Sequence, residues 1–312
     1  MSIPVVDLAR FQNVHEKADF VNELGLAFEK VGFVAVKNHG IPNDLITQLY
    51  KHVQSFFSLP DEVKRSYEIP MLAGQRGYTS FGKEHAKGYD APDLKEFFQF
   101  GQIVTNDSPL RAEYPANVFV DEVPDFTPTL ETTYQNFETC GFQLLQAIAL
   151  YLGLDEQYFN QHVTKGNSIL RAIHYPPIKQ EPKTSIRAEQ HEDINLITLL
   201  VGASADGLQI MNMQNEWIAA TAAPDQIVVN VGDMLQRLTN NRLKSTTHRV
   251  VNPPREMWNS PRFSIPFFLH PKSEMSLACL DSCIDVLHPK FYEDYTAGQY
   301  LEERLSEIGL KK

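Results

Sequence analysis

The stretch RAEQHEDINLITLLVG, residues 187–202, places His191 and Asp193 one residue apart at the head of an apolar run. In a β-strand, residues i and i+2 point to the same face, so these two side chains can bind one metal ion while Glu192 points away. An H-x-D tripeptide alone is a weak indication of a metal, because paired polar groups at a strand end are often structural. The rest of the chain must separate the two interpretations.

Further short apolar runs lie on both sides of this stretch, between Leu170 and about Leu269. They are LRAIHY, GLQIMN, QIVVNVG, THRVV and RFSIPFFLH, and turn residues separate them. Regularly spaced short strands of this kind are typical of a β-sandwich or barrel. The central third of the chain is therefore predicted to be a β domain.

Helices are predicted on both sides of this β region. Apolar residues recur at helical spacing in residues 15–31, and Gly32 follows at the position of a C-cap glycine. Further helices are predicted at residues 43–59, 60–67, 127–154 and 297–310, and further strands at residues 3–6, 33–37 and 94–101. The glycine-rich residues 71–89 predict a long loop, and long loops inside compact domains are often functional.

Composition limits the classes of partner. The chain of 312 residues has 28 basic and 39 acidic residues, so its field opposes a nucleic-acid backbone or an anionic membrane surface. It contains neither a run of eighteen apolar residues nor a basic and apolar leader at its start, which predicts a cytoplasmic protein. Three cysteines without metal-binding spacing fit a reducing compartment. A small-molecule substrate is favoured, and no obligate protein partner is indicated.

A second histidine strengthens the metal interpretation. His248 stands at the head of the later run THRVV, and two imidazoles with one carboxylate form the facial triad of non-haem Fe(II) oxygenases. Beyond it, Arg262 and Ser264 share one face of the strand in RFSIPFF. A guanidinium beside a hydroxyl is suited to bind a carboxylate through paired hydrogen bonds.

The order H-x-D, H-R-V and R-x-S-I-P-F-F closely resembles the isopenicillin N synthase-like Fe(II)/2-oxoglutarate-dependent oxygenases. The resemblance extends over nearly the whole chain, through IPVVDL, GFVAVKNHGIP, FFSLPDEVK, DLKEFFQFG, LRAIHYPP and EQHEDINLITLLV in the family's order. It implies a mainly β fold with flanking helices and a double-stranded β-helix core of the jelly-roll, cupin-like kind. A single oxygenase domain, residues 1–312, is expected. Its regions are an N-terminal α/β region (1–105), a helical region (106–165), the β-helix core (166–272) and a C-terminal helical region (273–312).

The resemblance also implies residue roles. His191, Asp193 and His248 would be the iron ligands. Arg262 and Ser264 would hold the C5 carboxylate of 2-oxoglutarate, with Tyr175 at the position that commonly assists them. Glu192 and Asn195 depart from the family's usual residues around the first two ligands, which leaves the contacts on the substrate side open.

The activity implied is oxidation of a small molecule with Fe(II), 2-oxoglutarate and dioxygen, and with release of succinate and carbon dioxide. Hydroxylation, desaturation and ring closure are all compatible with it. Three alternatives stay open. They are an oxidase that uses dioxygen without 2-oxoglutarate, an ethylene-forming enzyme, and a barrel that only binds a ligand.

A few residues are candidates for contact with the substrate. Arg171 shares a strand face with Tyr175, and a buried guanidinium needs an anion, which is either Glu84 or a carboxylate of the substrate. Tyr78 and Glu84 in the long loop, and Phe267 after Ser264, are further candidates for the pocket wall. Asp233, His39, His174 and His270 are expected to be structural.

Overall fold

The structure is a computed structural model that describes residues 3–72, 74–85, 88–89, 91–105, 107–182, 184–202 and 206–307. The end of the predicted last helix, from residue 308, lies outside these ranges. Among the helices that these ranges contain, none is long and apolar enough to cross a membrane.

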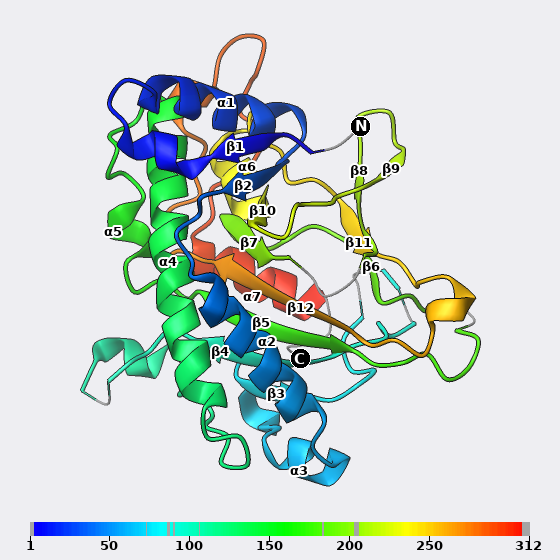
Figure 1. Ribbon diagram of the computed structural model, residues 1–312. Coiled ribbons are helices and arrows are strands. Elements are labelled where there is room, and N and C mark those ends of the chain that lie inside the picture. Colours follow the sequence, from blue (N-terminus) through cyan, green and yellow to red (C-terminus); the bar gives the residue numbers. More distant parts are fainter. Residues whose placement is uncertain are drawn as a thin grey trace.

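Two β-sheets form the centre of the molecule (Figure 1). The larger sheet has the strand order β1 (Val5–Asp7), β2 (Phe33–Lys37), β10 (Gln226–Val231), β7 (Ile197–Val201), β12 (Arg262–Leu269), β5 (Ile169–Tyr175), β4 (Glu96–Gly101) and β3 (Gly77–Thr79). The smaller sheet has the order β6 (Ala188–His191), β11 (His248–Val250), β8 (Leu208–Met211) and β9 (Trp217–Ala219). From β5 to β12 the chain passes repeatedly between the two sheets. This is the predicted double-stranded β-helix, and the expected fold class is confirmed.

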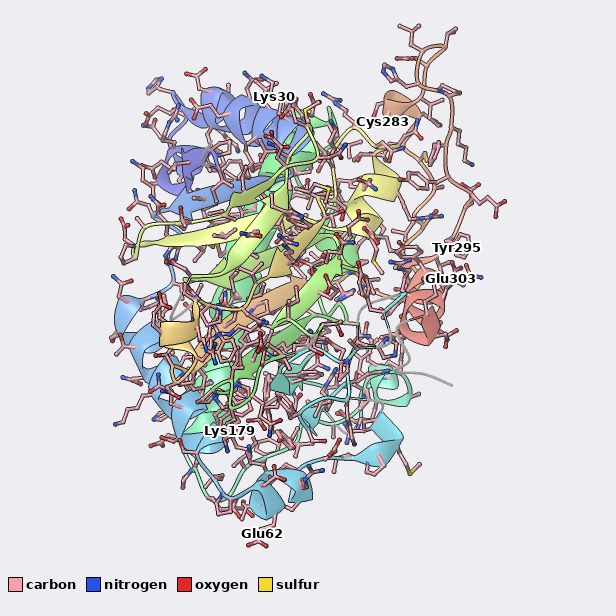
Figure 2. All side chains as sticks on the ribbon, turned by 90° about the vertical axis from the view of Figure 1, so that its right-hand side faces the viewer. Lys30, Glu62, Lys179, Cys283, Tyr295 and Glu303 are labelled. Atoms are coloured by element: carbon pink, nitrogen blue, oxygen red, sulfur yellow. The ribbon has the colours of Figure 1, made fainter. Side chains whose placement is uncertain are left out.

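The helices are α1 (Lys17–Lys30), α2 (Asn43–Phe57), α3 (Asp61–Ser66), α4 (Phe126–Tyr151), α5 (Asn160–Val163), α6 (Asp233–Leu238) and α7 (Ala297–Glu307). The largest of them cover the outer face of the larger sheet (Figure 1). The long helix α4 packs on β4, β7 and β12, and α1 and α2 pack on α4. Figure 2 shows Lys30 of α1 and Glu62 of α3 at opposite ends of the molecule, with strands between them. Gly32 follows α1 with φ +72°, as its predicted capping position requires.

Alternation along β12 decides which side chains face the space between the sheets. The side chains of Arg262, Ser264, Pro266 and Phe268 line a cavity there. Those between them point to the helices. Phe267 stacks on Phe137 of α4 at a centroid distance of 5.4 Å and contacts Tyr134 edge-on at 5.1 Å. The expectation that Phe267 lines the pocket is therefore wrong, because position 267 has the opposite parity from Arg262 and Ser264.

The contact between α1 and α4 gives a first prediction. A Cβ atom added at Gly25 of α1 would overlap the ring of Tyr151 at the end of α4. We expect Gly25→Ala to lower the free energy of unfolding by about 1–3 kcal/mol, the usual cost of overpacking a filled core. Urea unfolding followed by circular dichroism measures it. Gly202→Ala is the control, because no atom lies within 4 Å of the added Cβ there. Equal stabilities of the two variants would contradict the close packing of α1 on α4.

Candidate metal centre

A cavity of about 260 Å³ lies between the two sheets. Strands of both sheets line it, and the segment around Glu84 and Lys95 and helix α7 add further walls. Helix α7 is tied to α6 by the hydroxyl of Tyr300, which donates to Oδ2 of Asp233 at 3.0 Å. Asp233, the first residue of α6, thus has a structural role, as expected.

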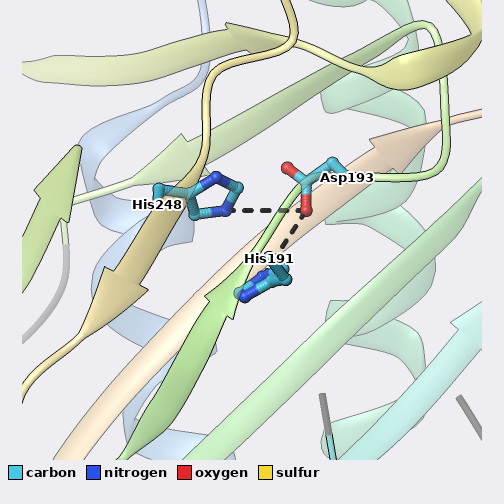
Figure 3. Close-up of side chains that lie close together, drawn as sticks. All are labelled: His191, Asp193 and His248. Carbon is cyan, nitrogen blue, oxygen red and sulfur yellow. Dashed lines mark ion pairs between the residues drawn. The ribbon is translucent and has the colours of Figure 1, made fainter. Parts of the chain in front are cut away.

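Three predicted ligands meet at one side of this cavity (Figure 3). His191 ends β6, His248 begins β11 directly opposite it, and Asp193 follows two residues after His191. Oδ1 of Asp193 lies 3.9 Å from Nε2 of His191 and 3.7 Å from Nε2 of His248. One ligand atom from each residue can be chosen so that all three lie within 4.8 Å of one another. An ion between them would be in reach of all three.

Backbone carbonyls orient both imidazoles. Nδ1 of His191 lies 2.6 Å from the carbonyl oxygen of Glu189, and Nδ1 of His248 lies 3.1 Å from that of Thr246. A carbonyl oxygen only accepts, so each Nδ1 carries a hydrogen, and the tautomer of the neutral ring that this favours presents a lone pair on Nε2. Burial, followed by the neighbouring His248, lowers the pKa of His191 to about 4. This imidazole is therefore neutral at pH 7, as a metal ligand must be.

Hydrogen bonds also hold Asp193. Its Oδ2 accepts from Oγ1 of Thr198 at 2.7 Å and from Nδ2 of Asn230 at 2.8 Å, which leaves Oδ1 toward the histidines. Burial favours the neutral acid, but the two imidazoles and these hydrogen bonds outweigh it and hold the pKa of Asp193 below its usual value. Asn195 belongs to this support, because its Nδ2 donates to Oγ1 of Thr198 at 2.8 Å. It is buried behind the centre and makes no contribution to the cavity wall.

The donor set fits ferrous iron. Two imidazole nitrogens and one carboxylate oxygen on one side of an ion leave the remaining positions toward the cavity, as in non-haem Fe(II) sites. The side chain of His191 is 37% exposed, whereas those of His248 and Asp193 are 10% and 6% exposed. The centre is thus reached from the cavity past His191.

The predicted carboxylate-binding residues lie along the same cavity. Arg262 is buried and pairs in register with Tyr175, and its guanidinium carbon lies 5.0 Å from the centroid of that ring. Ser264 pairs with Ile173 one step further along β12. All three predicted residues therefore come together on neighbouring strands, in a place suited to an anion.

A second arginine lies behind Tyr175. The guanidinium carbon of Arg187 is 5.9 Å from the ring centroid, and its Nη2 donates to the carbonyl oxygen of Ser260 at 3.0 Å. Burial, followed by the nearby Arg262, lowers the pKa of Arg187 to about 10, so it stays charged at pH 7. Its Nε is buried without a hydrogen-bond partner among the described residues. Sequence reasoning missed Arg187, because an arginine before a strand is ordinarily exposed.

The structure answers the question about Arg171. This residue lines the cavity on the same strand face as Tyr175, as predicted. Its Nη1 lies 3.1 Å from both carboxylate oxygens of Glu84, and its Nε donates to Oε1 of Gln99 at 3.0 Å. Glu84 also pairs with Lys95 at 2.6 Å. The anion beside Arg171 is therefore the internal one.

The structure also places Tyr78 and the three histidines that were expected to be structural. Tyr78 is buried in the core, donates to the carboxylate of Glu96 and packs on Phe56, so its expected place in the pocket wall is wrong. His174 is structural as expected, because its Nδ1 lies 2.7 Å from Oε1 of Glu96. His39 is too, since its Nδ1 accepts from the backbone N–H of Ile41. His270 is different, because it lines the cavity.

Comparison with known proteins gives consistent matches over nearly the whole chain. The family profile described as "non-haem dioxygenase in morphine synthesis N-terminal" matches residues 3–122, and that of the "2OG-Fe(II) oxygenase superfamily" matches residues 166–271. Proline hydroxylase buaE of Petromyces alliaceus is 35% identical over 302 residues, which cover 92% of each chain.

Solved structures show the same relationship. A 2OG-Fe(II) oxygenase family protein of Caulobacter crescentus is 39% identical with a TM-score of 0.89, over 98% of this chain and 99% of that one. A full-length Neurospora crassa protein, crystallised in complex with alpha-KG and thymine, is 30% identical with a TM-score of 0.85, over 97% and 96% of the two chains.

Proposed function

This chain belongs to the 2OG-Fe(II) oxygenase superfamily, and from that premise we propose that His191, Asp193 and His248 bind its iron. It is a 2-oxoglutarate-dependent dioxygenase that uses Fe(II), 2-oxoglutarate and dioxygen. The observation that carries the assignment of the ligands is the convergence of three donor atoms within 4.8 Å, with both imidazoles oriented by backbone carbonyls. When bound, the iron supplies activation of dioxygen, coupled to conversion of 2-oxoglutarate to succinate and carbon dioxide and to oxidation of the substrate.

Arg262, Ser264 and Tyr175 are assigned to the C5 carboxylate of 2-oxoglutarate. A buried guanidinium and two hydroxyl groups on neighbouring strands match the fork geometry and the charge of a carboxylate. Their part in the reaction is to bind and orient the cosubstrate so that its other end reaches the metal. The walls around it contain Ile173, Ala188 and Val250, which exclude water from the charged pair.

Succinate formation tests this function directly. Purified protein with Fe(II), 2-oxoglutarate and dioxygen is expected to convert 2-oxoglutarate to succinate slowly alone and faster with a substrate. Quantification of succinate, carbon dioxide and ethylene separates the alternatives, because an ethylene-forming enzyme fragments the cosubstrate differently. Dioxygen consumption without any loss of 2-oxoglutarate would instead identify an oxidase that does not use it.

Arg187 is assigned a positioning role at the same end of the cavity. Its buried charge adds to the positive potential near Arg262, and its guanidinium packs against Tyr175 from behind. The C5 carboxylate of the cosubstrate brings one negative charge to this pair of cations when it binds.

A substitution at Arg187 tests this role. We expect Arg187→Met to raise the dissociation constant of 2-oxoglutarate about tenfold, equal to about 1.4 kcal/mol, and to leave iron content unchanged. Calorimetric titration of the iron-loaded protein without dioxygen measures it. Arg255→Met, at an exposed position, serves as the matched control. The same affinity in both variants would assign Arg187 to the scaffold alone.

The substrate is a small molecule. Relatives differ in what their names or complexes specify, since one is named a proline hydroxylase and another was crystallised with thymine. We assign to this chain the oxidation of a small organic molecule at a carbon held next to the iron. Hydroxylation, desaturation and ring closure would all use the same site.

A further inference from the structure

One end of the cavity is built by the start of β5 and the end of β12. The register of these strands pairs Tyr175 with Arg262 at one end and Ile169 with Phe268 at the other. The carboxylate-binding residues occupy the first end. The second end is therefore available to the substrate, and its wall contains Asn167 and His270.

Neither of these two polar side chains has a hydrogen-bond partner in the part of the chain that the structure describes. Oδ1 of Asn167 and Nδ1 of His270 are buried without one. Their backbones lie together, since the N–H of Asn167 donates to the carbonyl oxygen of Pro271 at 3.3 Å. An unsatisfied buried polar group costs about 1–3 kcal/mol, so a bound molecule that pairs with these groups gains that energy.

Both side chains are neutral and bifunctional. An asparagine amide donates and accepts. Burial lowers the pKa of His270 to about 4, so at pH 7 one ring nitrogen donates and the other accepts. They match a ligand with both functions.

The charges around Arg171, in the same cavity wall, are already balanced. Arg171 and Lys95 carry two positive charges, and Glu84 and Asp93 carry two negative ones, joined by contacts of 2.6–3.1 Å. The hydrogen bonds of Arg171 to Glu84 and Gln99 use Nη1 and Nε, which leaves Nη2 outside both. Arg171 thus offers an N–H group without surplus charge, and these four side chains leave no unbalanced positive charge for an incoming carboxylate.

We propose that the substrate is a small uncharged molecule with a carbonyl acceptor next to an N–H donor, as in a cyclic amide or imide, bound by Asn167, Arg171 and His270. The ring of Phe268, whose centroid lies 5.4 Å from the guanidinium carbon of Arg171, gives its apolar face a surface to pack on. This inference rests on the proposed function, because it takes the iron and 2-oxoglutarate sites as the other end of the same cavity.

Matched pairs of probes that differ by one carboxylate test the charge. They are uracil with orotate, and 2-pyrrolidinone with pyroglutamate. Each is titrated calorimetrically, without dioxygen, into protein loaded with Fe(II) and 2-oxoglutarate. We expect the neutral member of each pair to bind about tenfold more tightly or better. Tighter binding of the acids, or no binding of either neutral probe, would overturn the inference.

The same titration distinguishes a wrong substrate class from a wrong function. Binding of 2-oxoglutarate is measured first, in the unmodified protein and in Arg262→Leu. Its absence from the unmodified protein would contradict the proposed function. If 2-oxoglutarate binds and the neutral probes do not, only the substrate class is wrong.

Substitutions test the residues themselves. Asn167→Ala and His270→Phe are each expected to weaken the neutral probes about tenfold, while the dissociation constant of 2-oxoglutarate changes by less than about twofold. Asn43→Ala, at an exposed position of α2, is the control. Retained binding of 2-oxoglutarate shows that a variant is folded. Unchanged affinity for uracil and 2-pyrrolidinone in both variants would refute the assigned contacts.

Removal of one negative charge is expected to strengthen the binding of an acidic probe, whereas the two preceding substitutions weaken the binding of neutral probes. Glu84→Gln leaves one positive charge uncompensated next to Arg171, so orotate is expected to gain about tenfold in affinity while uracil stays nearly unchanged. Glu62→Gln on the exposed surface of α3 is the matched control. An orotate affinity that does not rise would show that the charge balance at Glu84 does not set the preference.

Discussion

Replacement of His191 or His248 by alanine is expected to remove bound iron and to lower turnover by about three orders of magnitude or more. Two remaining ligands would hold the ion weakly and out of geometry, and even the loss of a residue that only supports a ligand commonly costs about 10–100-fold. Iron content after gel filtration, measured by mass spectrometry, and succinate formation report the two effects separately. His15→Ala, at an exposed position, controls for the loss of a histidine.

Metal replacement extends the same test. Zinc is expected to occupy the centre, because imidazole and carboxylate are also its ligands, but without turnover, since Zn²⁺ has no redox chemistry. Full turnover with zinc, or wild-type turnover in iron-loaded His191→Ala, would refute the assigned centre.

The fold was accessible from local patterns because each strand of the core is short, apolar and closed by turn residues. The larger sheet buries one face against helices and the other against the cavity, so β12 is apolar on both faces except at Arg262 and Ser264. Those two polar residues mark the cavity face of β12. The same alternation excludes Phe267 from that face. Phe267 lies an odd number of residues from Arg262 and Ser264, so the alternation alone predicts that it points to the helices and not into the pocket.

The metal ligands could be predicted because their spacing expresses geometry. His191 and Asp193 are close in sequence, and His248 begins another strand, where it meets His191 in register. The orientation of the imidazoles could not be predicted, because it depends on carbonyl groups of Glu189 and Thr246 whose direction is set by the folded backbone.

The substrate side was less accessible, because it depends on pairings between distant segments. Arg171 and Glu84 are 87 residues apart, and both possible anions for this arginine stayed open until the chain was folded. His270 was expected to be structural, but it lines the cavity. A histidine after a strand is ordinarily satisfied by its surroundings, and only the folded structure reveals a ring in the cavity wall whose Nδ1 has no partner among the described residues.

The second large effect is expected on the affinity for 2-oxoglutarate, at the end of the cavity that contains Arg262. Arg262→Leu should raise the dissociation constant of 2-oxoglutarate by roughly 30-fold to 4,000-fold, because loss of one charge-assisted pair in a desolvated pocket costs about 2–5 kcal/mol. The size of the effect depends on burial, and Arg262 is 1% exposed. Calorimetry with the iron-loaded protein measures it without requiring a substrate.

Arg262→Lys discriminates between charge and geometry. Lysine keeps the positive charge but loses the paired N–H groups that match a carboxylate, so its affinity for 2-oxoglutarate should lie between those of the unmodified protein and Arg262→Leu. In all three proteins the iron content should be equal, since Arg262 is not among the three ligands. If the affinity for 2-oxoglutarate is the same in Arg262→Leu as in the unmodified protein, the cosubstrate carboxylate lies elsewhere. The end of the cavity at Asn167 and His270 could then no longer be assigned to the substrate on the ground that 2-oxoglutarate occupies the end at Arg262.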